Sequence, residues 1–192
     1  MYATLYYFKR EENMKLMIIS DIHGSGYYAD KIKEIVEKEK PEKLILLGDI
    51  YYHGPRNELT QEYNPTHVAE VINSMKDIIM CIKGNCDAEV DEMISDFKFN
   101  NELDMCIDDM IVMFTHGHKY NMDNLPKKNI DVLVYGHFHT GFIKKENGIY
   151  FLNPGSISIP KENTKHSYMI WENGTVYLKD VDGEVIEKRK LG

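Results

Sequence analysis

The sequence predicts an α/β domain in which a largely parallel sheet is followed by a second, mostly antiparallel sheet. Over the first hundred residues, apolar runs alternate with amphipathic stretches, which indicates strands joined by right-handed helical crossovers. Later in the chain, turn dipeptides separate β-rich stretches, which is typical of hairpins. The chain has 192 residues, of which 43% are hydrophobic, so it is long enough to bury one core of its own.

The first half of the chain alternates between the two element types. Continuous apolar runs predict buried strands at 16–20, 43–47 and 78–82. Apolar residues at helical spacing predict helices over 28–36, which Pro41 ends, and over 68–75. Strands joined by helical crossovers lie parallel, so these three should be neighbours in one sheet. A further short helix is predicted over 93–97.

The second half carries the signals of hairpins. Apolar runs predict strands at 105–107, 111–115 and 132–135. Four dipeptides that favour tight turns lie between β-rich stretches: Asp108-Asp109, Asn147-Gly148, Asn173-Gly174 and Asp182-Gly183.

The chain is predicted to form one domain over residues 14–192, without internal repeats or linkers. Residues 1–13 differ from the rest, because their aromatic and charged residues show no period. We therefore expect them to form a loosely ordered N-terminal extension.

Charge and cysteine content exclude several classes of protein. A formal net charge of −8 argues against holding nucleic acid on a broad basic surface. Three cysteines without a C-x-x-C pair do not predict a disulfide framework or a structural zinc site. No apolar run approaches the ~20 residues that span a bilayer, and no signal-peptide core is present. A cytoplasmic protein that does not bind membranes is expected.

Chemically competent side chains follow five predicted strands. In open α/β sheets, ligands bind at the carboxyl ends of the strands, so these side chains should converge. Each of these side chains alone has an ordinary structural explanation. It is improbable, however, that metal-binding residue types follow five separate strands by coincidence. In chain order the residues are Asp21, His23, Asp49, Asn85, His116, His137 and His139.

This set of side chains suits divalent cations. Imidazole nitrogens and carboxylate oxygens bind Mn²⁺, Fe²⁺, Zn²⁺ and similar ions. Seven ligands are too many for one ion that must keep an open position, but they suit two ions that share a carboxylate. Glycines beside several of these residues allow the backbone to approach a crowded centre closely.

The motifs DIH, GD, GN-x-D, HGH and GH-x-H occur in this order. Together they resemble the calcineurin-like metallophosphoesterase superfamily, and within it the branch of small YfcE-like phosphodiesterases. The resemblance extends from about residue 14 to residue 167. It implies a four-layer αββα sandwich of two mixed sheets flanked by helices, and a centre of two divalent metal ions. Mn²⁺ is the expected occupant, with Zn²⁺, Fe²⁺, Ni²⁺ or Mg²⁺ as alternatives.

The resemblance also implies a role for each matching residue. Asp49 would bridge the two metals, and a hydroxide that attacks phosphorus would form the other bridge. Two divalent ions, two carboxylates and one hydroxide leave a charge of about +1, which complements a phosphodiester monoanion. The ligands of the first metal would be Asp21, His23 and His139, and those of the second Asn85, His116 and His137.

Four further residues are weaker candidates. Most members of the superfamily have His where this chain has Cys86, and that His is thought to protonate the leaving oxygen. A thiol is a poorer donor near neutrality, so we expect a preference for diesters with good leaving groups, unless Cys86 only fills space. His118 would protonate the leaving group or support a ligand, or it would make only a structural hydrogen bond. Arg56 and Asn57 would bind the substrate phosphate, although a solvated loop explains Arg56 equally well.

These observations predict a metal-dependent phosphodiesterase that acts on small phosphodiesters. Two alternatives stay open. A nuclease would use the same metal centre, but the acidic charge disfavours a stable complex with nucleic acid. A non-catalytic protein-binding scaffold of the same fold would have lost the ligands, whereas all seven positions here hold competent residues. A homo-oligomer is an additional expectation.

Overall fold

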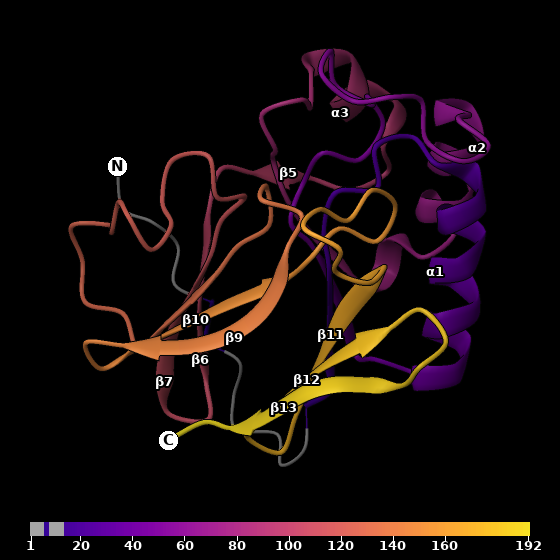
Figure 1. Cartoon of the computed structure of the whole chain (residues 1–192). Helices are drawn as coiled ribbons and strands as arrows, with labels where there is room; N and C mark the ends of the chain where they lie inside the picture. The colour runs from indigo at the N-terminus through magenta and orange to yellow at the C-terminus, as the bar shows by residue number, and fades with distance from the viewer. Residues whose placement is uncertain (1–5, 8–13) are drawn as a thin grey trace.

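The computed structural model describes residues 6–7 and 14–192, and in this part of the chain thirteen strands form two mixed sheets. The two sheets pack face to face around a common apolar layer. Helices cover the outer face of one sheet, on the right in Figure 1. The predicted fold class, an α/β sandwich of two mixed sheets, is confirmed, and of its two predicted helical layers the described residues form the one on the seven-stranded sheet.

The seven-stranded sheet has the order β13-β12-β11-β2-β3-β4-β5. Its centre, β2 to β4, is parallel, as the alternation of strands and helices predicts. Three antiparallel strands from the end of the chain extend it on the β2 side. The strands are β2 (Leu16–Ile19), β3 (Lys43–Leu46), β4 (Ile79–Ile82), β5 (Phe99–Asn100), β11 (Ser167–Glu172), β12 (Thr175–Asp180) and β13 (Val185–Lys190).

The six-stranded sheet has the order β1-β6-β7-β8-β10-β9. β8 pairs in parallel with β7 and with β10, while β6–β7 and β9–β10 are antiparallel hairpins. The strands are β1 (Tyr6–Tyr7), β6 (Leu103–Ile107), β7 (Met110–Phe114), β8 (Val132–Val134), β9 (Gly141–Glu146) and β10 (Ile149–Pro154).

Two sequence expectations about the sheets are wrong. The second sheet is mixed and not mostly antiparallel, because β8 lies parallel to both of its neighbours. The hairpins at Asn173-Gly174 and Asp182-Gly183 form as predicted, but their strands belong to the first sheet. A turn signal indicates which strands pair with each other, whereas the sheet that they join depends on distant contacts.

Two longer helices pack on the seven-stranded sheet (Figure 1). The Ser25 side chain caps α1 (Gly26–Glu39) by accepting the Tyr28 N–H, and Lys40 ends it in the left-handed conformation just before Pro41. Asn64 caps α2 (Pro65–Asn73), which begins with proline. A 3₁₀ turn, η1 (Lys76–Ile78), precedes β4.

The short helix α3 (Glu89–Ile94) begins four residues before the helix predicted over 93–97 and ends inside that range. Its apolar residues do not face the core, since Met93 is 84% exposed. The helix is instead fixed at its start, where the Asp91 carboxylate accepts the Ala88 N–H. Phe97 lies beyond its end and stacks on Phe99.

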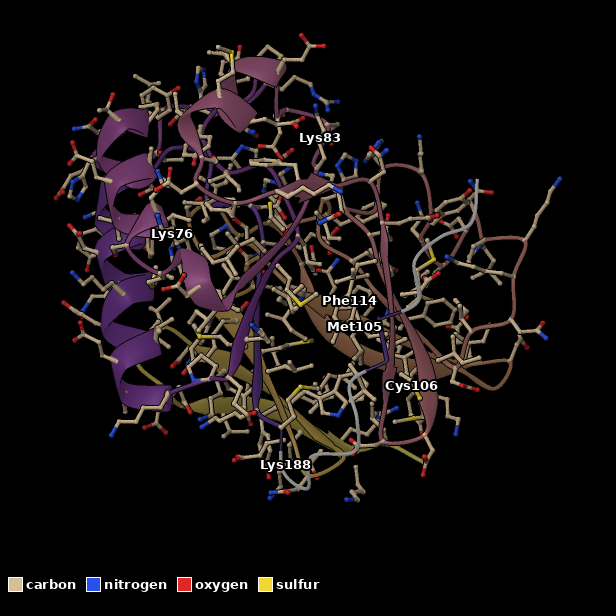
Figure 2. All side chains as sticks on the ribbon, turned by 180° about the vertical axis from the view of Figure 1, so that it is seen from behind. Lys76, Lys83, Met105, Cys106, Phe114 and Lys188 are labelled. Carbon is tan, nitrogen blue, oxygen red and sulfur yellow. The ribbon has the colours of Figure 1, made fainter. Side chains whose placement is uncertain are left out.

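The main core lies between the two sheets. Figure 2 shows Met105 and Phe114 in the middle of the molecule, and both belong to this buried layer. A second layer lies between the seven-stranded sheet and the helices. The outer face of the six-stranded sheet has a small cluster around Leu133 and Phe151, which Tyr120 and Met122 cover from the loop after β7.

Most of the extension expected over residues 1–13 lies outside the described residues. Its two described residues form β1, which pairs in parallel with β6 at the edge of the six-stranded sheet. Among the helices that the structure describes, none is long and apolar enough to cross a bilayer.

Candidate metal centre

The seven predicted ligands lie just after the carboxyl ends of five strands. β2, β3 and β4 are adjacent parallel strands of one sheet, and β7 and β8 are adjacent parallel strands of the other. A hydrogen bond joins the two sets, because the backbone N–H of His137 donates to Oδ2 of Asp21 at 3.0 Å. The five segments therefore meet at one rim of the sandwich.

Three side chains form the first ligand group. Nε2 of His139 lies 3.3 Å from Oδ1 of Asp21 and 3.3 Å from Nε2 of His23. Nδ1 of His23 donates to the carbonyl of Tyr52 at 2.7 Å, and Nδ1 of His139 donates to the carbonyl of Ile159 at 2.8 Å. A neutral imidazole that donates through Nδ1 carries its lone pair on Nε2. Both lone pairs and the carboxylate oxygen thus point at one spot.

Three further side chains form the second ligand group. Nε2 of His116 lies 3.0 Å from Oδ1 of Asn85 and 3.2 Å from Nδ1 of His137. Nδ1 of His116 donates to the carbonyl of Leu47 at 2.7 Å, so Nε2 again carries the lone pair. The amide nitrogen of Asn85 faces Sγ of Cys86 at 3.3 Å, which turns its oxygen toward His116.

Asp49 lies between the two groups. Its Oδ2 is 3.7 Å from Nε2 of His23 in the first group and 3.4 Å from Nε2 of His116 in the second. Its other oxygen, Oδ1, accepts the backbone N–H of Cys86 at 2.8 Å, which fixes the orientation of the carboxylate. The position of Asp49 matches that of a ligand shared by two ions.

The donor set is electrostatically unfavourable unless positive charge is present. Oδ1 of Asp21 is buried and has no hydrogen-bond partner within the described residues. Lone pairs of His23 and His139 face each other at 3.3 Å beside it. An unpaired buried charge of this kind is costly, and a divalent cation would satisfy all three atoms at once. The residues therefore fit a metal ion.

The pKa values of Asp21 and His116 also show that the buried site favours positive charge. Burial alone would raise the pKa of Asp21, but the neighbouring imidazoles of His139 and His23 hold it well below its usual value. Burial alone would lower the pKa of His116, but its hydrogen bond with Asp49 and the charge of Asp21 raise it to about 9. The two carboxylates thus draw positive charge toward the buried site.

The backbone of the ligand loops is strained. A positive φ is uncommon for residues other than glycine and costs about 1–2 kcal/mol, and such residues cluster at functional sites. Five of the seven ligands have a φ between 50° and 66°: Asp21, His23, Asp49, His137 and His139.

Two glycines make room for the centre. A Cβ at Gly84 would lie 2.1 Å from Oδ1 of Asp49, and one at Gly136 would lie 1.8 Å from Oγ of Ser20 and 2.8 Å from Oδ2 of Asp21. The expectation that glycines allow close backbone approach is confirmed at these two positions.

Asp87 is not a predicted ligand, but its carboxylate joins two ligand loops. It accepts the N–H of Gly84 at 2.7 Å. It also accepts the N–H groups of Asp49 and Ile50, both at 2.9 Å. Asp87 therefore ties the loop that carries Asn85 to the loop that carries Asp49.

Two serines hold the backbone of Asp21, and neither is among the predicted site residues. The hydroxyl groups of Ser156 and Ser158 each donate to the carbonyl of Asp21 at 2.8 Å. Both lie just after the end of β10 at Pro154. The signal available was weak: two small polar residues directly after a strand.

Cys86 and His118 both lie near the centre. Cys86 is half-buried, and burial together with the charge of Asp49 raises the pKa of its thiol to about 12. Its sulfur and ligand atoms of His23 and Asp49 all lie within 4.8 Å of one another, close enough to share an ion. His118 is exposed, its ring centre is 5.5 Å from that of His116, and its imidazole makes no hydrogen bond to another described residue. The catalytic roles of Cys86 and His118 stay predictions.

The loop after Asp49 carries the two predicted phosphate-binding residues. Asn57 donates its amide N–H to the carbonyl of His53 at 2.7 Å, within its own loop. Arg56 is exposed and forms no ion pair with the described part of the chain. The loop lies beside the centre, since a Cβ at Gly54 would be 3.5 Å from Sγ of Cys86. A role in substrate binding stays a prediction for both residues.

Comparison with known proteins identifies the family. The model of the calcineurin-like phosphoesterase superfamily domain matches residues 14–175. The chain belongs to this superfamily. Phosphodiesterase YfcE of Escherichia coli K12 is 40% identical over 162 residues, which cover 83% of this chain and 88% of that protein.

Two solved structures share the fold of this chain. The structure of YfcE, described as a phosphoesterase from E. coli, superposes with a TM-score of 0.90 at 35% identity, covering 93% of this chain and all of that one. Vacuolar protein sorting 29 of Cryptosporidium parvum superposes with a TM-score of 0.63 at 18% identity, covering 94% of this chain and 100% of that one. The second likeness shows the fold alone. Membership of the superfamily makes this chain a phosphoesterase that binds divalent metal.

Proposed function

We propose that this phosphoesterase hydrolyses small phosphodiesters with the help of two divalent cations, and we expect both to be Mn²⁺. Asp49 would bind both ions. The first ion would also be held by Asp21, His23 and His139, and the second by Asn85, His116 and His137.

The convergence of lone pairs on two spots with Asp49 between them carries this proposal. Each spot receives three donor atoms from three side chains, and Oδ2 of Asp49 is within 3.7 Å of a histidine nitrogen of each group. A structural role does not require nitrogen and oxygen lone pairs to face one another in a buried site. The identity with a phosphodiesterase, YfcE, adds the reaction class.

The residues of the chain would prepare the site for a diester. When bound, divalent cations lower the pKa of coordinated water and neutralise charge on phosphate oxygens. The carbonyls behind His23, His116 and His139 fix the orientation of the rings, as outer-sphere hydrogen bonds commonly do. Only two of the seven ligands, Asp21 and Asp49, are negative, so two bound cations leave the site positive and suited to a phosphodiester monoanion.

Two other functions are less well supported. A nuclease needs a surface for a polyanion, and the net charge of −8 opposes it. A protein-binding scaffold does not need seven competent ligands with strained backbones. Self-association and a cytoplasmic location stay predictions.

The test is a substrate screen with Mn²⁺-loaded protein on phosphomonoesters, cyclic nucleotides and bis(4-nitrophenyl) phosphate. We expect hydrolysis of the diester and at least a 100-fold loss of rate in Asp49→Asn. Asp109→Asn is the matched control: it makes the same change in an exposed turn between β6 and β7, and should retain full activity.

Three outcomes would contradict the proposal. Protein that binds two equivalents of Mn²⁺ and cleaves no diester would favour the scaffold. Salt-sensitive binding and cleavage of an oligonucleotide in preference to small diesters would favour the nuclease. An Asp49→Asn variant with unchanged rate would show that the activity arises elsewhere.

A further inference from the structure

A polar cavity of about 260 Å³ is lined by His118, whose ring centre lies 5.5 Å from that of His116 in the second ligand group. Its walls come from chain segments that also carry ligands. Thr115 directly precedes His116, Lys119 lies three residues after it, and Lys83 lies two residues before Asn85. Three residues of extended chain span about 10 Å, so each of these wall residues begins within about 10 Å of a ligand. Figure 2 shows Lys83 at the end of the molecule where α3 lies.

The wall of the cavity carries several hydrogen-bonding side chains. Thr115 contributes a hydroxyl, and the residue is 3% exposed. The imidazole of His118 and the hydroxyl of Tyr120 line the same cavity. These groups donate and accept hydrogen bonds, so the wall is suited to a polar ligand.

The charges of the cavity leave one cation uncompensated. Nζ of Lys83 pairs with Glu92 at 2.6 Å. Glu102, the acidic residue of the wall, lies 3.8 Å from Nζ of Lys128. Lys119 forms no ion pair with the described residues. The wall therefore presents a free ammonium group together with neutral donors.

Exposed aromatic side chains also lie beside the centre. Phe138 lies between the ligands His137 and His139, its ring centre is 5.2 Å from that of His137, and it is 43% exposed. Tyr52, whose carbonyl holds His23, is 42% exposed. The surroundings of the centre therefore include aromatic rings as well as the polar cavity.

We propose that the polar cavity binds one alcohol arm of the diester and selects an arm rich in oxygen acceptors, of the size of a sugar or nucleoside, with Thr115 and Lys119 as specificity-determining residues. This inference rests on the proposed function. The arm would accept hydrogen bonds from the Thr115 hydroxyl and the Lys119 ammonium, while the phosphate lies at the ligand groups. Hydrogen bonds to charged groups contribute enough to change affinity by about tenfold.

The experiment compares three diesters with a common leaving group, in Mn²⁺-loaded protein. Thymidine 5′-(4-nitrophenyl) phosphate, bis(4-nitrophenyl) phosphate and methyl 4-nitrophenyl phosphate all release 4-nitrophenolate as water adds to phosphorus, so only the retained arm differs. We expect a kcat/KM at least tenfold higher for the thymidine arm than for the methyl arm, mainly through KM.

Variants locate this preference. Lys119→Met and Thr115→Val should each reduce the thymidine-to-methyl ratio about five- to tenfold. Lys127→Met is the matched control, since Lys127 is exposed on the same loop and outside the cavity wall, and it should keep the ratio of the unmodified protein. An unchanged ratio in both cavity variants, or an equal loss in Lys127→Met, would overturn the inference.

Binding without turnover separates this inference from the proposed function. Calorimetry of thymidine 5′-phosphate with the same proteins should show about tenfold weaker binding in Lys119→Met. If that loss occurs while no diester is hydrolysed, the cavity assignment holds and the phosphodiesterase assignment fails. If diesters are hydrolysed but thymidine 5′-phosphate binds equally to all variants, the cavity assignment fails alone.

Discussion

Replacing Gly84 with alanine should disable the centre without unfolding the protein. The new Cβ would lie 2.1 Å from Oδ1 of Asp49 and 2.4 Å from its backbone nitrogen, whereas real Cβ contacts essentially never fall under 3.0 Å. Asp49 must therefore move by about 1 Å, away from the N–H of Cys86 that orients it. A misplacement of about 1 Å in a catalytic site costs about 100-fold in rate.

The assay is kcat/KM for bis(4-nitrophenyl) phosphate in Mn²⁺, together with the number of Mn²⁺ ions bound and a thermal melt. We expect about 100-fold lower kcat/KM and weaker binding of Mn²⁺. Gly148→Ala is the control: it lies in the β9–β10 turn with a φ of 86° and nothing within 4 Å of the new Cβ. It should lose about 1 kcal/mol of stability and retain its activity. A Gly84→Ala protein with full rate and full Mn²⁺ affinity would refute the reasoning.

Three further predictions concern residues around the centre and the fold. Glu39 accepts bonds from Lys15 and Lys179, both at 2.6 Å, and its pKa falls from 4.5 to about 2 against the effect of burial. With solvent screening this network contributes about 1–2 kcal/mol at neutral pH. A carboxylate whose pKa is lowered in the folded state stabilises the fold at pH values above its unfolded pKa, and this stabilisation is lost as the pH falls. In urea unfolding, Glu39→Gln should therefore lower the free energy of unfolding by this amount at pH 7 and by less at pH 3. An equal loss at both pH values would argue against the ion pairs. Asp87→Asn replaces one acceptor oxygen with a donor that faces backbone N–H groups, so it should cost about 2–3 kcal/mol and weaken Mn²⁺ binding; a melt that responds to Mn²⁺ as in the unmodified protein would contradict the link to the centre. Cys86→His should raise the rate on diesters with poor leaving groups relative to good ones, and an unchanged dependence on leaving-group pKa would remove Cys86 from the mechanism.

The ligand segments were predictable because their signals are local. Each ligand follows a buried apolar strand within a few residues, and neighbouring parallel strands deliver their ends to one rim. The structure brings all seven side chains together there. The ring-orienting carbonyls of Leu47, Tyr52 and Ile159 were not predictable, because every residue has a carbonyl and its side chain carries no sign of this use.

The sheet assignment was less predictable, because strand pairing is non-local. Turn dipeptides predicted the hairpin β11–β12, but only the contact of β11 with β2 decides which sheet it extends. The start of α3 was also missed, because Val90 and Met93 are exposed and their spacing therefore says nothing about a buried face. Its position depends on Asp91 instead, which periodicity of apolar residues cannot detect.

The left-handed backbone conformation of the ligands lowers the stability of the protein, whereas their side chains are needed for its chemistry. Glycine at His137 would adopt the observed φ without steric cost, so variants chosen only for a higher melting temperature should accumulate at this position. Each such variant would be a better-folded protein and a dead catalyst. Directed evolution of this fold toward thermostability therefore needs a screen for turnover at every round.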